Sequence, residues 1–216
     1  APTRVAPGGI IWISGISLGP AEGVKAAGTP WPTQLGEPAI QVMINGRAAP
    51  IASATPARIV AQVPWETTPG LAQVVVRRGQ TETRPARFFV DPVRPSLRAE
   101  NDQGYGVAGA TTDGRTITLS AFGLGPAEPR IASGSAAGDD DIHPLSAARV
   151  FVGGVPAAAS IKLSKSRVGE YDVRIELPPQ SQPGDVISVE AGGQAANRTT
   201  YRQSSVPEVQ FLRIPD

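Results

Sequence analysis

An internal repeat constrains the fold of this chain more than any other feature of its sequence. Residues 11–20 and residues 117–126 carry the same order of apolar positions, and both segments close on Leu-Gly-Pro. The two copies lie about 106 residues apart. Self-similarity of this kind is the signature of a duplicated structural unit, so the repeat predicts two similar domains in tandem.

Two further matches follow in the same order along the chain. Residues 42–50 match residues 150–158 at an offset of about 108, and residues 63–70 match residues 177–184 at about 114. In the last pair a Val-Pro or Leu-Pro step is followed by Pro-Gly at the same spacing. Because the offsets grow in small steps, small insertions in the second copy account for them. The series indicates duplication of a whole domain.

The junction between the copies falls at residues 91–95, where Pro92 and Pro95 stand close together. Proline has no backbone N–H to donate to a sheet, and it stiffens a linker. The expected organisation is therefore a first domain over residues 1–91, a second over residues 96–203, and a tail over residues 204–216 that lies outside the repeat.

Glycine and proline punctuate short apolar runs throughout both copies. The chain has 24 Gly and 22 Pro, well above average usage, and they interrupt almost every window of helical spacing. Residues 41–44 followed by Asn45-Gly46 read as a strand and a tight hairpin turn. Six or so such strands per copy predict an all-β protein of two tandem immunoglobulin-like β-sandwiches with Greek-key links.

Charge and cysteine content exclude several classes of function. The chain has 20 basic and 19 acidic residues without a basic stripe, which argues against binding nucleic acid. No apolar stretch approaches the ~20 residues that span a bilayer. Disulfides and thiolate metal sites are impossible because cysteine is absent, and no cofactor is expected. A start at Ala1-Pro2 would fit a secreted protein after removal of its signal peptide, or equally a trimmed chain.

Two motifs of the first copy are the most specific in the sequence. They are Asn45-Gly46-Arg47-Ala48-Ala49-Pro50 and the Gln-Val-Pro-Trp-Glu of residues 62–66. With them the chain resembles an uncharacterised C-terminal domain of secreted proteins from Solibacter-type acidobacteria, a family that is itself similar to the IPT/TIG class of Ig-like domains. The resemblance implies an extracellular or cell-surface module without catalytic residues.

The second copy departs from the second of these motifs. Residues 176–179 read Glu-Leu-Pro-Pro, so Pro179 stands where the first copy has Trp65. We expect Trp65 to plug one end of the first sandwich, and the packing at the matching corner of the second to differ.

The acidic run at residues 139–141 stands next to His143, the single histidine. Carboxylates beside an imidazole could hold a hard cation such as calcium. Adjacent residues of an extended segment point apart, so we expect a solvated acidic loop instead. The chain also lacks a Gly-x-Ser-x-Gly nucleophile motif. We therefore expect no enzyme activity.

Two tryptophans are candidate contacts for a glycan. In the first strand of the repeat Ile11 and Ile13 hold the inward phase, which leaves Trp12 facing outward. Trp31 stands between two prolines in a long connection. Burial of Trp12 beneath that connection or against the other domain is the alternative.

The tail carries one more apolar strand. In residues 209–214 the side chains of Val209, Phe211, Leu212 and Ile214 are apolar on both faces of an extended segment. An apolar strand at a chain end needs a partner. It could fold back onto its own chain, which we favour, or it could add to a sheet edge of a neighbouring copy, head to tail.

The sequence thus predicts a non-enzymatic, secreted or cell-surface Ig-like module of structural or adhesive function. Its partner would be a protein, including a further copy of itself, or an extracellular polysaccharide. A self-assembling filament subunit and a carbohydrate-binding module remain as alternatives.

Overall fold

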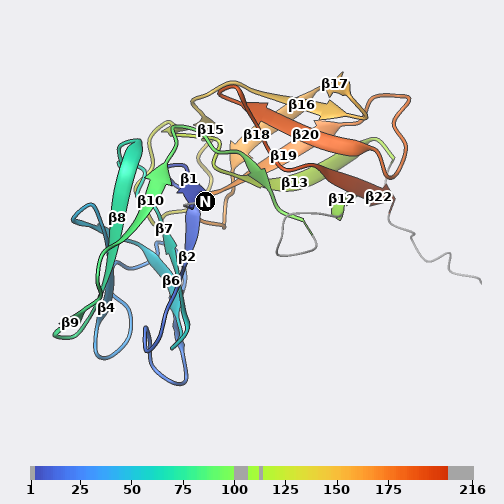
Figure 1. Ribbon diagram of the computed structural model, residues 1–216. Helices are drawn as coiled ribbons and strands as arrows, with labels where there is room; N and C mark the ends of the chain where they lie inside the picture. The colour runs from blue at the N-terminus through green and yellow to red at the C-terminus, as the bar shows by residue number, and fades with distance from the viewer. Residues whose placement is uncertain (1–2, 100–106, 112–113, 204–216) are drawn as a thin grey trace, which may run out of the picture.

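The computed structural model describes residues 3–99, 107–111 and 114–203 and contains β-strands, turns and loops, with no helix among these residues. Figure 1 shows two bodies inclined to each other, one built from the blue to green part of the chain and one from the green to red part. We call them domain 1 and domain 2. The tail strand proposed for Val209, Phe211, Leu212 and Ile214 lies outside the described residues.

Domain 1 is a sandwich of two sheets, in which all strand pairs are antiparallel except that β1 runs parallel to β10. The first sheet has the order β1 (Arg4–Val5), β10 (Ala86–Val90), β8 (Gly70–Arg78), β4 (Ile40–Ile44) and β5 (Arg47–Ala49), and β9 (Thr81–Glu82) also pairs with β8. The second sheet has the order β2 (Ile10–Ser14), β7 (Arg58–Gln62), β6 (Ile51–Ala54) and β3 (Val24–Lys25).

Domain 2 repeats this plan. Its first sheet has the order β12 (Val107–Thr111), β22 (Thr199–Gln203), β20 (Val186–Ala191), β16 (Ala148–Val152) and β17 (Val155–Ala157), and β21 (Gln194–Ala195) also pairs with β20. The second sheet has the order β11 (Ser96–Leu97), β13 (Thr116–Phe122), β19 (Glu170–Glu176) and β18 (Ala159–Leu163). A small hairpin, β14 (Ala127–Glu128) with β15 (His143–Pro144), lies in the long connection.

The strand order is that of an immunoglobulin-type sandwich in both domains. In each first sheet an opening strand runs parallel to the last strand of the domain, and the remaining pairs are antiparallel. Strands β4 and β5 form a hairpin in the first sheet, and the chain then crosses to β6 in the second sheet, as Greek-key connections require. The predicted fold class, all-β with two tandem Ig-like sandwiches, is confirmed.

The hairpin turns that the sequence marks are formed by residues with positive φ. Asn45 and Gly46 have φ values of 48° and 81°, and Gly153 and Gly154 have 57° and 82°. Two successive positive φ values give a turn whose twist matches that of the flanking strands. The turns therefore set the register of β4 with β5 and of β16 with β17.

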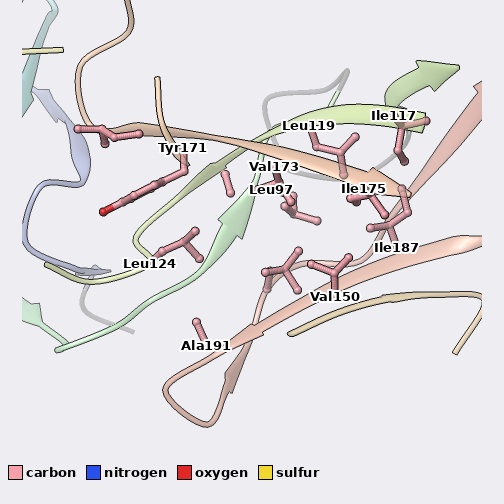
Figure 2. Packing of buried hydrophobic residues seen from close by; sticks show 14 of the residues in the cluster. Leu97, Ile117, Leu119, Leu124, Val150, Tyr171, Val173, Ile175, Ile187 and Ala191 are labelled. Carbon is pink, nitrogen blue, oxygen red and sulfur yellow. The ribbon is translucent and has the colours of Figure 1, made fainter. Parts of the chain in front are cut away.

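Each sandwich encloses its own hydrophobic core. In β4 the side chains of Ile40, Val42 and Ile44 are buried, and those of Gln41 and Met43 are turned toward the opposite face. The same alternation in β13 and β19 builds the core of domain 2 (Figure 2). Burial of such side chains supplies the main stabilising free energy of each domain.

Tyr171 closes one end of the core of domain 2, with its hydroxyl at the margin of the cluster (Figure 2). The side chain is 1% exposed, and its hydroxyl donates a hydrogen bond to the carbonyl of Gly125 at 3.2 Å. Burial raises the pKa of the Tyr171 phenol above its usual value of 10.0. The folded state therefore favours the neutral phenol. The contribution of this preference to the free energy of unfolding is fully present below pH 10 and is lost as the pH rises further.

We predict that Tyr171→Phe lowers the free energy of unfolding by about 1 kcal/mol at neutral pH, because one buried hydrogen bond is lost. Above pH ~10 the unfolded wild-type chain releases a proton that the folded chain retains, so the wild type should lose stability more steeply than the variant. Urea unfolding at neutral pH and at pH ~11 measures both effects. Equal pH dependence in the two proteins would contradict the role of this phenol.

Candidate functional site

A buried amide fastens domain 1 to domain 2. Gln62, at the end of β7, is 0% exposed. Its side-chain N–H donates to the carbonyl of Gly8 at 3.1 Å, and its side-chain oxygen accepts from the N–H of Gly134 at 2.6 Å. Gly134 belongs to the long connection of domain 2, and its carbonyl accepts from the N–H of Trp31 at 2.8 Å. Domain 1 thus binds both the N–H and the carbonyl of Gly134.

Gly134 has no room for a side chain at this contact. Its φ is +88°, and a Cβ atom there would lie 2.8 Å from the carbonyl oxygen of Trp31 and 3.1 Å from Pro50. The positive φ and the close approach both require glycine.

Trp65 lies at the same junction. Its ring packs against the core of domain 2 and lies over Gly8, and its backbone N–H donates to the hydroxyl of Ser133 at 2.9 Å. That hydroxyl donates in turn to Glu66 at 3.1 Å. Trp65 therefore lies at the junction and packs on the core of domain 2, and not on the core of domain 1 as the sequence predicts.

The linker adds a third attachment. Val93 is buried among the core residues of domain 2, and the N–H of Arg94 donates to the carbonyl of Gly123 at 2.8 Å. The proline-bearing segment at residues 91–95 is thereby packed onto domain 2, so its geometry is set by contacts in addition to its own stiffness.

A cleft of about 940 Å³ lies between the two domains. Domain 1 contributes the face of the β2, β7 and β6 sheet that points away from its core. Domain 2 contributes the linker, the end of β13 and the loops before β19 and β22. Both tryptophans that the sequence singles out, Trp12 and Trp31, line this cleft, and Phe122 faces them from domain 2.

Trp12 presents most of its ring surface to solvent, with 55% of the residue exposed. The guanidinium of Arg58 lies 4.9 Å from its ring centroid, in a cation–π contact. Trp31 is half-buried, and its backbone is bound to Gly134. The alternative in which Trp12 is buried against the other domain does not hold in the structure.

Arginines dominate the charge of the cleft. Four of them line it, against a single carboxylate among the described lining residues, Glu170. Glu170 is 2% exposed; one oxygen accepts from Arg98 and the other from Arg167, both at 2.6 Å. Arg98 also lies over the ring of Phe122, 5.4 Å from its centroid. These contacts hold both guanidinium groups in place at the wall of the cleft.

Arg94 and Arg4 complete the charged wall. Arg4 is paired with Asp91 at 2.5 Å and lies over the ring of Phe89. Arg94 is exposed, and within the described ranges no carboxylate lies at ion-pair distance from it. The cleft thus combines exposed aromatic faces with guanidinium donors.

The sequence could identify Trp12 by its outward phase and Trp31 by its place between prolines. It contained no signal that Phe122, Arg94 or Arg98 would stand opposite them. Those residues lie far away along the chain and reach the cleft because of how the domains are joined.

The acidic loop lies elsewhere, and two of its three aspartates pair with lysines. Asp139 pairs with Lys165 at 3.1 Å, and Asp141 pairs with Lys162 at 2.8 Å and with His143 at 3.3 Å. The hydrogen bond from Lys162 lowers the pKa of Asp141, with a smaller contribution from His143. Within the part of the chain that the structure describes, no three acidic or histidine side chains are grouped to hold a metal ion, and no helix is long and apolar enough to cross a membrane.

We predict that Gln62→Met lowers the free energy of unfolding by about 1–3 kcal/mol, because Gly8 and Gly134 then each keep a buried group without a partner. The lost bond to Gly134 should also loosen the domains, which X-ray scattering in solution would report as a larger radius of gyration. Gln73→Met is the matched control, since the side chain of Gln73 is exposed on β8. An unchanged radius of gyration would show that the amide does not hold the two domains together.

No family model matches the sequence, and no curated protein shows significant similarity to it. Several solved structures are similar in fold. The SGBP-B protein of the Bacteroides ovatus mixed-linkage glucan utilization locus, in complex with a mixed-linkage heptasaccharide, is 12% identical with a TM-score of 0.42, over 94% of this chain and 44% of that one.

Two others are proteins of surfaces. The BSP domain of a biofilm-associated protein is 10% identical with a TM-score of 0.34, over 95% of this chain and 29% of that one. Domains 4–9 of the surface layer protein SbsC are 11% identical with a TM-score of 0.29, over 94% of this chain and 30% of that one. The chain spans less than half the length of each of these three structures, and likeness at this level does not indicate what it binds.

Proposed function

We propose that this chain is a non-enzymatic, extracellular adhesive module that binds a carbohydrate in the cleft between its two sandwiches. The observation that carries the proposal is the meeting of Trp12, Trp31 and Phe122 at one cleft from three separate segments of the chain. An exposed tryptophan is unfavourable in water unless it serves a contact, because its large apolar surface is then left hydrated.

The chemistry of the cleft suits a sugar chain. Pyranose rings present apolar C–H faces that pack on flat aromatic rings, and their hydroxyls accept hydrogen bonds at the edges. Arg98 and Arg94 supply donors on the wall opposite Trp12. The volume of about 940 Å³ lies within the range of small-molecule sites, which is enough for a few sugar units.

Glu170 favours binding over catalysis. Glycoside hydrolysis needs a pair of carboxyl groups, one of which gives or takes a proton. Among the described lining residues Glu170 is the one carboxylate, and both of its oxygens are occupied by arginines. It is placed to fix those arginines, not to move a proton.

The extracellular location is supported by the resemblance of the 45–50 and 62–66 motifs to domains of secreted acidobacterial proteins. A pair of sandwiches joined by buried hydrogen bonds would then act as one rigid unit that presents the cleft to a polysaccharide at the cell surface or beyond it.

We predict that Trp12→Ala weakens polysaccharide binding about 10- to 150-fold, because burying one large apolar side chain contributes about 1.5–3 kcal/mol. Affinity electrophoresis against a panel of neutral and acidic polysaccharides would find the ligand, and titration calorimetry would give the ratio. Ile16→Ala is the control, since Ile16 is 93% exposed and lies outside the cleft lining. If no polysaccharide in the panel retards the wild-type chain, the carbohydrate proposal is wrong.

A further inference from the structure

Strand β2 is an edge strand of domain 1 whose outer side has no partner among the described residues. The N–H of Val63 donates to the carbonyl of Gly9 at 2.8 Å, and the N–H of Gly15 donates to the carbonyl of Ala57 at 3.1 Å. In an antiparallel ladder the residues that bond to one neighbour alternate. The backbone groups of Ile10, Trp12 and Ser14 therefore point away from β7.

The repeat supplies a direct comparison, because the equivalent strand of domain 2 is covered. Strand β13 pairs with β11 along this side, with Leu97 opposite Ala121. The N–H of Arg98 donates to the carbonyl of Ser120 at 2.9 Å, and Ser120 matches Ser14 in the sequence repeat. The same edge is thus closed in one copy and open in the other.

The open edge lacks the devices that usually protect an exposed strand. Such strands are commonly short or interrupted by charges or proline, which prevents another chain from pairing with them. Strand β3 has two residues and ends in Lys25, and β5 has three and is followed by Pro50. Strand β2 has five residues, Ile-Ile-Trp-Ile-Ser, without a charge or a proline. An unprotected strand edge of this kind pairs readily with a further strand.

The way β13 is covered indicates what covers β2. The covering strand β11 is the segment that directly follows β10, the last strand of domain 1. Strand β22 is the counterpart of β10 in domain 2, and residues 204–216 follow it. Leu97-Arg98, at the end of β11, recurs as Leu212-Arg213 in this segment. The segment therefore holds the same place after domain 2 as the covering strand holds after domain 1.

The direction of the chain points to another molecule. Strand β10 ends beside domain 2, whereas β22 runs to the end of domain 2 that is remote from β2 (Figure 1). To reach β2 of the same molecule from the end of β22, a chain would have to turn back along the length of domain 2.

We propose that residues 209–214 of one copy add as an antiparallel strand to the outer edge of β2 in a second copy. The joint between two copies then repeats the joint between the two domains, with a strand from one sandwich closing the next. Such a contact joins different surfaces of the two copies, so it continues head to tail and builds an open filament. This inference does not depend on the carbohydrate proposal.

The test compares the full chain with two variants by light scattering over a range of concentrations. The first ends at Ser205 and so lacks the donor strand; the second is Ser14→Pro, which removes an outward N–H and leaves the ladder with β7 intact. The full chain should reach at least twice the mass of one chain, and both variants should stay at the mass of one. Ser14→Ala is the matched control and should assemble as the full chain does.

A second measurement keeps the test independent of folding defects in the variants. A peptide of residues 206–216 should bind the chain that ends at Ser205 with a stoichiometry of one to one. It should slow hydrogen exchange at the amides of Ile10, Trp12 and Ser14. A full chain that remains at the mass of one copy, or assembly that survives Ser14→Pro, would overturn the proposal. Protection of these amides in a chain of single mass would show that the tail folds back instead.

Discussion

The side-chain amide of Gln62 is the interaction on which the arrangement of the two sandwiches depends. A fully buried amide is costly unless its donor and its acceptor are both satisfied, and Gln62 satisfies one within domain 1 and the other in domain 2. The position of Gly134 follows from that bond, and the position of Trp31 follows from Gly134. The cleft exists because this chain of contacts leaves the outer side of β2 facing the linker and β13 without filling the space between them.

The duplication explains both the stability of the molecule and its asymmetry. Each copy buries its own core, and the core of domain 2 is extended by Val93 of the linker and Trp65 of domain 1. The two copies differ in what lies beside their equivalent strands, β2 and β13. Strand β13 has β11 along its edge, and β2 has no such strand among the described residues. A cleft with aromatic walls and a strand edge open to pairing thus arise together from placing two similar units in series.

Local signals made much of the fold predictable. Asn45-Gly46 predicts its hairpin because two successive positive φ values are needed there and this pair adopts them readily. Alternation predicts that Ile11 is buried and Trp12 exposed, which the structure bears out. The site was predictable only in part. Trp12 and Trp31 carry local signals, but nothing near Arg98 or Phe122 in the sequence indicates that they face a tryptophan more than 80 residues away.

The sequence by itself determined the number of units, the class of fold and which side chains of the main strands face the core. These depend on periodicity and turn chemistry, which act between residues close together in the chain. The tertiary structure alone decided that two tryptophans and a set of arginines share one cleft, and that β13 is covered along the edge at which β2 has no partner among the described residues. These properties depend on the angle at which two finished domains meet, and that angle is set by a few buried hydrogen bonds between residues distant in sequence.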